Sequence, residues 1–155
     1  MSFDILYDYF ANLIIIFIVV SSVVILISLV MYIMTAIGLY SIACHKGYKS
    51  QAIFAWIPLA NSYLSGLLAE EIDFFGKKIT NLKTVYLVAS ILSVVISVIP
   101  VINFIYSLFL LILGIKINIK IAWYYEPSKA VSYGLFSFIG FFIIGRNLRE
   151  STTPT

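Results

Sequence analysis

The sequence predicts an all-α integral membrane protein, a compact bundle of three to four transmembrane helices with one broken re-entrant or interfacial helix. Of its 155 residues, 62% are hydrophobic and only 11% are charged. Its mean hydropathy of +1.06 exceeds what a small soluble domain can bury, because such a domain leaves much of its surface in water. The apolar residues also form long runs separated by charges. We therefore expect a single membrane domain over residues 1–155.

The first apolar run, residues 13–39, contains no charged residue. It exceeds the roughly 20 residues that a helix needs to cross the hydrocarbon core, so we expect a transmembrane helix over residues 12–40. The N-terminus carries Asp4 and Asp8 and no basic residue, whereas a cleavable signal peptide has a basic start. The segment is therefore expected to stay in the mature protein.

All ten basic residues follow this first segment. By the positive-inside rule, the N-terminus is expected outside and the loop 45–50 in the cytoplasm. The basic residues are dispersed at the ends of apolar segments, without a basic run. The net charge of +3 therefore indicates topology, not binding to nucleic acid.

The second apolar segment, residues 52–69, is interrupted by Pro58 and Asn61 and has lysines on both flanks. A full crossing would place one lysine group outside. We therefore expect a broken helix that dips in from the cytoplasmic face or lies along it. A short full crossing is the alternative, because three acidic residues after the segment dilute the lysine signal.

Residues 82–115 form an apolar run that one helix would extend over about 50 Å, too long for a core of about 30 Å. The run is therefore expected to fold back at Pro100 and Asn103, in a turn outside the membrane. This predicts transmembrane helices over residues 82–99 and 102–123.

The last apolar segment, residues 131–145, is short for a crossing and has basic residues on both sides. A short fourth transmembrane helix and a re-entrant hairpin are equally favoured. Residues 146–155 form a polar tail, which is expected to be disordered from Glu150 onward.

One five-residue phrase occurs twice, as Ile57-Pro58-Leu59-Ala60-Asn61 and as Ile99-Pro100-Val101-Ile102-Asn103. A proline lacks a backbone donor and interrupts a helix, and an asparagine amide in lipid needs a partner. We expect each amide to satisfy backbone groups that the proline frees, with a ligand role as the alternative. The candidate structural or functional polar residues are Pro58, Asn61, Pro100 and Asn103, with the first pair favoured.

Small residues recur along the predicted helices and predict packing seams, because they allow close approach in lipid. A hydroxyl-lined pathway is the alternative. The seams are Ser21, Ser28 and Thr35; Ala89, Ser93 and Ser97; and Gly134, Ser137 and Gly140.

The chemistry-bearing residues are few. No Asp, Glu, Arg or His falls in the middle of an apolar segment, where proton relays and substrate sites place them. Cys44 is expected to be a packing residue, with palmitoylation or metal binding beside His45 as alternatives. The acidic residues at 70, 71 and 73 are expected in a solvated amphipathic turn. The sequence predicts no catalytic, cofactor-binding or metal site, so we do not expect an enzyme.

A resemblance to a known group rests on four features in order. They are Lys46-Gly47-Tyr48, the segment 56–63, the second Pro-x-x-Asn phrase and a glycine-rich apolar end. From residue 46 to 145 the chain resembles small uncharacterised multi-pass bacterial membrane proteins with repeated Pro-x-x-Asn segments. It departs from them where Trp123-Tyr124-Tyr125-Glu126 replaces an expected Phe-Gly pair. The resemblance implies the bacterial cytoplasmic (inner) membrane and no particular activity.

The expected function is that of a non-enzymatic accessory, scaffold or immunity-type interaction protein, since small-residue seams occur without buried charge. Its expected partners are the lipid bilayer and a membrane protein or a second copy of the chain, but no nucleic acid. The alternative is an oligomeric pore or transport component, holin-like or a small transporter subunit. A membrane enzyme is the least favoured class.

Overall fold

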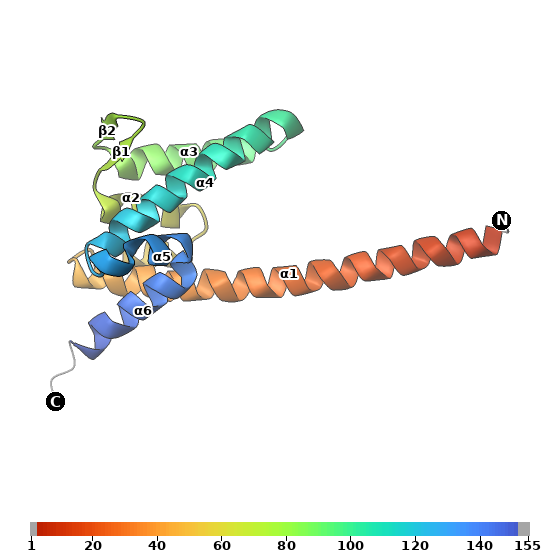
Figure 1. Cartoon of the computed structure of the whole chain (residues 1–155), viewed down its shortest axis with the longest axis horizontal. Helices are drawn as coiled ribbons and strands as arrows, with labels where there is room; N and C mark the ends of the chain where they lie inside the picture. Colours follow the sequence, from red (N-terminus) through yellow and green to blue (C-terminus); the bar gives the residue numbers. More distant parts are fainter. Residues whose placement is uncertain (1–2, 152–155) are drawn as a thin grey trace. The chain divides into compact units, whose positions relative to one another are not determined.

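The computed structural model describes residues 3–151 and is built mainly of α-helices (Figure 1). Within that range it has six α-helices, two short 3-10 helices and one two-stranded hairpin. The all-α class predicted from the sequence is thus confirmed. The chain divides into two compact units, Met1–Tyr32 and Ile33–Thr155.

In its described residues, the first unit consists of the N-terminal part of helix α1 (Phe3–His45), which continues into the second unit. Its large side chains are exposed on every side of the helix, as Phe17 at 73% and Ile25 at 65% illustrate. The stretch Tyr9–His45 is long and apolar enough to cross a membrane. Ser28 of the predicted seam is exposed and Ser21 is half-buried.

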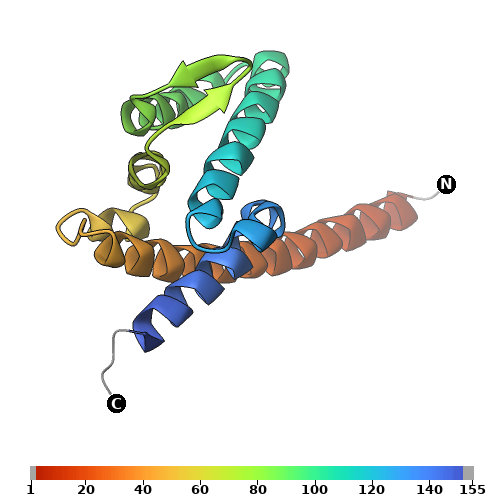
Figure 2. The same ribbon diagram turned by 60° about the vertical axis from the view of Figure 1, so that its left-hand side comes forward.

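The second unit has a core where the end of α1 meets the later helices (Figure 2). In addition to Leu39 and Ile42 from α1, the core is made by α2 (Ala60–Ala69), α4 (Pro100–Trp123) and α6 (Ser137–Glu150). Its largest fully buried side chains are Phe141, Leu39, Ile42, Leu64, Leu68, Leu82, Leu113, Ile117, Ile121 and Ile144.

The segment 52–69 consists of the 3-10 helix η1 (Ala52–Trp56) and then α2, with an interruption between them. Leu59, directly after Pro58, has a φ of 67° and precedes the first residue of α2. A backbone with positive φ cannot continue a helix, so the chain changes direction there.

The run 82–115 folds back on itself as α3 (Leu82–Ile96) and α4. Pro100 is at the first position of α4, where a missing N–H costs no hydrogen bond. The Tyr106 hydroxyl donates to the Ala89 carbonyl over 2.9 Å and joins the two helices. The turn between them is apolar and open, with Val98 81% exposed. Helix α4 is the second helix long and apolar enough to cross a membrane.

A β-hairpin follows α2, where an amphipathic turn was expected. Strands β1 (Ile72–Phe74) and β2 (Lys77–Ile79) pair antiparallel through the register Asp73↔Lys78. Phe75 and Gly76 both have positive φ, as a two-residue hairpin turn requires. Phe74 is buried and meets the ring of Phe109 edge-on at 5.6 Å. This contact attaches the hairpin to α4.

The C-terminal part runs through η2 (Pro127–Lys129), α5 (Ala130–Leu135) and α6, with a break at Phe136. Helix α6 continues through the first half of the expected polar tail as far as Glu150. An ion pair between Arg146 and Glu150 at 2.8 Å, one turn apart, supports this extension. Residues 152–155 lie outside the described residues.

Glycines allow the helices of the second unit to touch backbone to backbone. A Cβ on Gly38 would overlap the carbonyl group of Phe141, and one on Gly145 would lie 3.0 Å from the Gly38 Cα. In the predicted C-terminal seam, a Cβ on Gly134 would overlap Ile119 of α4. Gly38 is therefore a point of close contact for α1 in this unit.

The two helix-interior substitutions Gly38→Ala and Gly114→Ala should have opposite effects on stability. Gly38→Ala should lower the free energy of unfolding by about 2 kcal/mol, since the new methyl group meets rigid backbone. At Gly114 the new Cβ meets only the Tyr86 hydroxyl at 3.0 Å, the end of a flexible side chain. Helix propensity then favours alanine by about 1 kcal/mol.

Thermal unfolding of the two variants in one detergent, followed by circular dichroism, measures this difference. Equal melting temperatures for the two would contradict the close crossing of α1 and α6.

Candidate functional site

Lys46 joins three helix ends in the second unit. It follows the last residue of α1, and Gly47, with a φ of 90°, turns the chain after it. Its ammonium group donates to the Leu68 carbonyl at 2.9 Å and to Glu70 Oε1 at 2.6 Å. The same group lies 4.3 Å from the centre of the Tyr124 ring, just after α4. We call these four residues the Lys46 junction.

The junction is stabilised mainly by the bond to the helix end. Carbonyls in the last turn of a helix lack partners, and a cation there also meets the negative end of the helix dipole. The ion pair adds less, because the Glu70 side chain is 52% exposed and water screens the charges. Burial, with help from Glu70 and Glu71, raises the pKa of Tyr124, so its ring stays neutral beneath the ammonium group.

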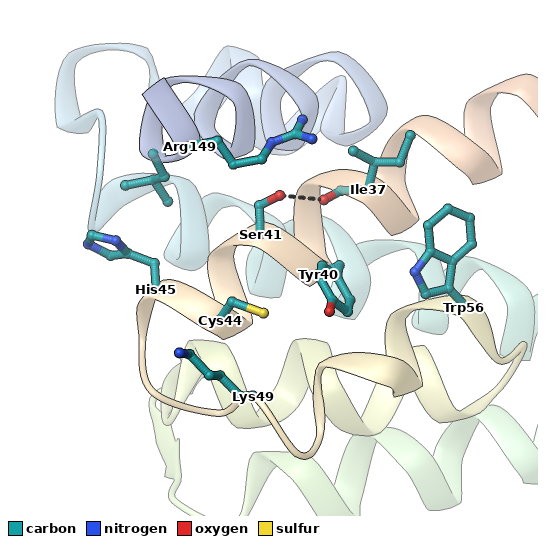
Figure 3. Close-up of a pocket in the computed structure, with 9 residues that line it drawn as sticks. Ile37, Tyr40, Ser41, Cys44, His45, Lys49, Trp56 and Arg149 are labelled. Atoms are coloured by element: carbon teal, nitrogen blue, oxygen red, sulfur yellow. Dashed lines mark hydrogen bonds between the residues drawn. The ribbon is translucent and has the colours of Figure 1, made fainter. Parts of the chain in front are cut away.

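A groove of about 580 Å³ lies beside the last turns of α1 (Figure 3). We call it the His45 groove. One part of its lining is apolar, from Ile37, Tyr40 and Trp56, and the remainder includes three basic side chains. Its lining residues are Ile37, Tyr40, Ser41, Cys44, His45, Lys49, Trp56, Leu148 and Arg149.

The His45 groove does not assemble an activated nucleophile. The Ser41 hydroxyl donates to the Ile37 carbonyl at 2.9 Å and is thereby engaged. The Cys44 thiol and the His45 ring point in different directions from α1 (Figure 3), and His45 meets the ring of Tyr125 edge-on. A thiol needs a base within hydrogen-bond reach for such chemistry. Within residues 3–151, no three His, Cys, Asp or Glu side chains cluster as a metal site requires.

A second groove, of about 700 Å³, lies between the β-hairpin and the C-terminal half of α4. We call it the Lys120 groove. Its lining residues are Glu71, Ile72, Asp73, Lys78, Lys116, Ile119, Lys120 and Trp123. It differs from the His45 groove in carrying both acidic and basic groups.

The two copies of the repeated phrase make the same backbone hydrogen bond. The Asn61 N–H donates to the Ile57 carbonyl at 3.0 Å, and the Asn103 N–H donates to the Ile99 carbonyl at 2.8 Å. Each bond closes the turn that carries the proline. The four candidate residues therefore lie at the starts of two different helices, Pro58 just ahead of α2 and Pro100 within α4.

The carbonyls that lose a donor at the two prolines are those of Phe54 and Ile96, four residues earlier. They accept from the N–H groups of Ile57 at 3.2 Å and Ile99 at 2.9 Å. The asparagine N–H bonds are ordinary backbone bonds of the next turn. The Asn103 amide oxygen only receives a long bond of 3.5 Å from the Ser107 hydroxyl. None of the four candidate residues lines the His45 groove or the Lys120 groove.

A buried hydroxyl pair also has a packing role. The Ser90 hydroxyl donates to the Tyr86 carbonyl at 2.8 Å and lies 2.9 Å from the Ser62 hydroxyl. Because Ser90 has only one hydroxyl proton, Ser62 donates to Ser90, and the pair links α3 to α2 where Gly66 approaches the Leu82 carbonyl. Both hydroxyl groups are buried in the second unit and fasten the two helices together.

Sequence reasoning missed the Lys46 junction and the Lys120 groove. The lysines were related to topology and to the resemblance, and no contact was predicted for any of them. Two features of the sequence could have indicated the Lys46 junction. Lys46 stands beside Gly47 directly after a long predicted helix, and aromatic residues cluster at 123–125.

Comparisons with family models, curated proteins and solved structures give no match to this chain. The structure thus defines a class, an all-α chain with two helices capable of crossing a membrane. The resemblance to small bacterial membrane proteins stays a prediction.

Replacing Lys46 with methionine should lower the free energy of unfolding by about 1–2 kcal/mol, because the Leu68 carbonyl loses a charged donor. Lys49→Met removes the same charge from an exposed position in the same loop and should change stability by less than about 0.5 kcal/mol. Chemical or thermal unfolding of the two variants side by side is the measurement. If both substitutions lower the free energy of unfolding by the same amount, the contacts of the Lys46 junction do not stabilise the protein.

Proposed function

We propose that this chain is a multi-pass protein of the bacterial cytoplasmic membrane that acts without catalysis. Its role is that of an accessory, scaffold or immunity-type protein, which binds a membrane partner or a second copy of itself. The observation that carries the proposal is α1, an apolar helix whose stretch Tyr9–His45 is 37 residues long and exposed on all sides over most of its length.

A lipid surrounding explains the exposed apolar surface. In water, side chains such as Phe104 at 68% and Ile105 at 65% exposure on α4 would be costly, whereas hydrocarbon solvates them. Trp123 and Tyr124, at the end of α4, suit the headgroup level. Helix α3, with 15 residues, extends about 22 Å and would cross with the help of its snorkelling Lys83.

Three crossings fit these lengths best. The N-terminus is outside, α1 crosses inward, α3 crosses outward and α4 returns to the cytoplasm. The C-terminal segment is interrupted at Phe136, and only the part of α6 before Arg146 is apolar. That part is too short for a core of about 30 Å, which favours a re-entrant or interfacial position for α5 and α6.

The partner-binding face is on α1. In lipid, helices associate by close packing, so residues with small side chains mark the face that a second helix can approach. Ser21 and Ser28 are seven residues apart and share one face of α1, whereas Val23 and Val30 share the opposite face.

Single cysteines at these positions, on a Cys44→Ser background, test the proposal. Ser21→Cys and Ser28→Cys should give strong crosslinks in membranes, to a second copy or to a co-purifying partner. Val23→Cys and Val30→Cys place the same thiol at similar depths on the other face and should give at least about fivefold less product. Equal yields on both faces, or a strictly monomeric chain at all four positions, would overturn the proposed role.

Thiol labelling in intact cells tests the topology separately. A cysteine at Asp73 should be protected from an impermeant reagent, since the hairpin is cytoplasmic, and a cysteine at Asn103 should be labelled from outside. Labelling at Asp73 from outside would contradict this topology, whatever the crosslinks show.

A further inference from the structure

The Lys120 groove has a basic wall on α4 and an opposite wall formed by the β-hairpin. Lys116 and Lys120 are one turn apart on α4 and both line the groove. The opposite wall is the β-hairpin, which is fixed by the Phe74–Phe109 contact and by a long bond of 3.4 Å from Lys116 to the Asp73 carbonyl. The groove is therefore formed by elements that already pack on each other.

The groove is lined by more basic than acidic side chains, and only one of its lysines forms an ion pair with a described residue. Lys78 is engaged by Glu71 at 2.8 Å, and this hydrogen bond, followed by the charges of Glu71 and Asp73, raises the pKa of Lys78. Among the described residues, no carboxylate oxygen lies within 4.0 Å of the ammonium groups of Lys116 and Lys120. The two cations thus face the groove without an ion-pair partner in the described part of the chain, in a lining that also includes Glu71 and Asp73.

Aromatic rings hold these two cations in place. Lys120 lies 5.6 Å from the Trp123 ring and 5.3 Å from the Tyr124 ring, and Lys116 lies 5.6 Å from the Phe74 ring. Cation–π contacts keep the ammonium groups near the groove while leaving their donors available. An oxyanion in the groove would therefore meet two cationic donors on one wall.

An apolar strip leads away from the groove. Ile112 is one turn before Lys116 on α4, and Phe109 is nearly one further turn before it, and both are exposed. Lys116, Ile112 and Phe109 share one face of the helix. A ligand with an anionic head and a hydrocarbon tail could contact both the basic groove and the apolar strip. A soluble anion would contact only the lysines of the groove.

We propose that the Lys120 groove binds the phosphate group of an anionic phospholipid, with an acyl chain along Ile112 and Phe109 of α4. The proposal rests on the membrane location proposed above. Basic pockets at the cytoplasmic end of transmembrane helices favour anionic headgroups, since lysines there meet a negative lipid surface. The bound lipid would fasten the β-hairpin to α4 and so stabilise the second unit.

The test uses the full chain in mild detergent and measures its melting temperature against added lipid. Phosphatidylglycerol should raise the melting temperature by a few degrees, and phosphatidylcholine should not. In Lys116→Gln/Lys120→Gln, the lipid concentration for half of the shift should rise about 30-fold, or the shift should vanish. Lys77→Gln/Lys129→Gln removes the same charge at exposed positions outside the groove and should keep the wild-type response.

Three outcomes would overturn the proposal. An undiminished phosphatidylglycerol shift in Lys116→Gln/Lys120→Gln would place the lipid elsewhere. An equal shift from phosphatidylcholine would remove the role of the headgroup charge. Inorganic phosphate or glycerol phosphate acting as well as the lipid, at the same phosphate concentration, would assign the groove to a soluble anion.

Failure of this site and failure of the proposed function give different results. A lost lipid response with intact crosslinks on α1 would reject the lipid site alone. An intact lipid response with no crosslinks would reject the interaction role alone. A chain that remains soluble after cell fractionation would reject the membrane location on which both depend.

Discussion

The ammonium group of Lys46 connects three helix ends that are far apart in the sequence. It bonds to the end of α2 at Leu68, pairs with Glu70 and lies over Tyr124 after α4. Once these ends are held together, the hairpin that follows α2 is positioned against α4, and the Lys120 groove forms between them. A single cation therefore links the helical core to a groove lined by both acidic and basic side chains.

Local backbone chemistry made several features of the fold predictable. A proline within an apolar run interrupts a helix by simple sterics, whereas length alone does not, since α1 is continuous over the 37 residues of Tyr9–His45. The interruption before Asn61 and the turn before Asn103 follow from this rule. The carbonyls of Phe54 and Ile96, which the prolines leave without a donor, accept from the N–H groups of Ile57 and Ile99, and the sequence does not show this tighter turn.

Features that depend on distant parts of the chain could not be predicted in this way. The strands Ile72–Phe74 and Lys77–Ile79 are too short to show an alternating pattern, and Phe109 lies far along the chain from Phe74. The Lys120 groove combines residues from the hairpin and α4 that no spacing rule connects. The glycine seam at 134–140 was recognisable, but the contact of Gly38 with Phe141 was not.

That contact imposes an order on the assembly of the chain. Gly38 lies on α1, and Phe141 and Gly145 lie on α6, which follows α1 and four other helices in the chain. During translation, the glycine face of α1 therefore stays uncovered until α6 has emerged. The C-terminal helix then closes the second unit, so a ribosome that stops early leaves a product lacking its final helix crossing.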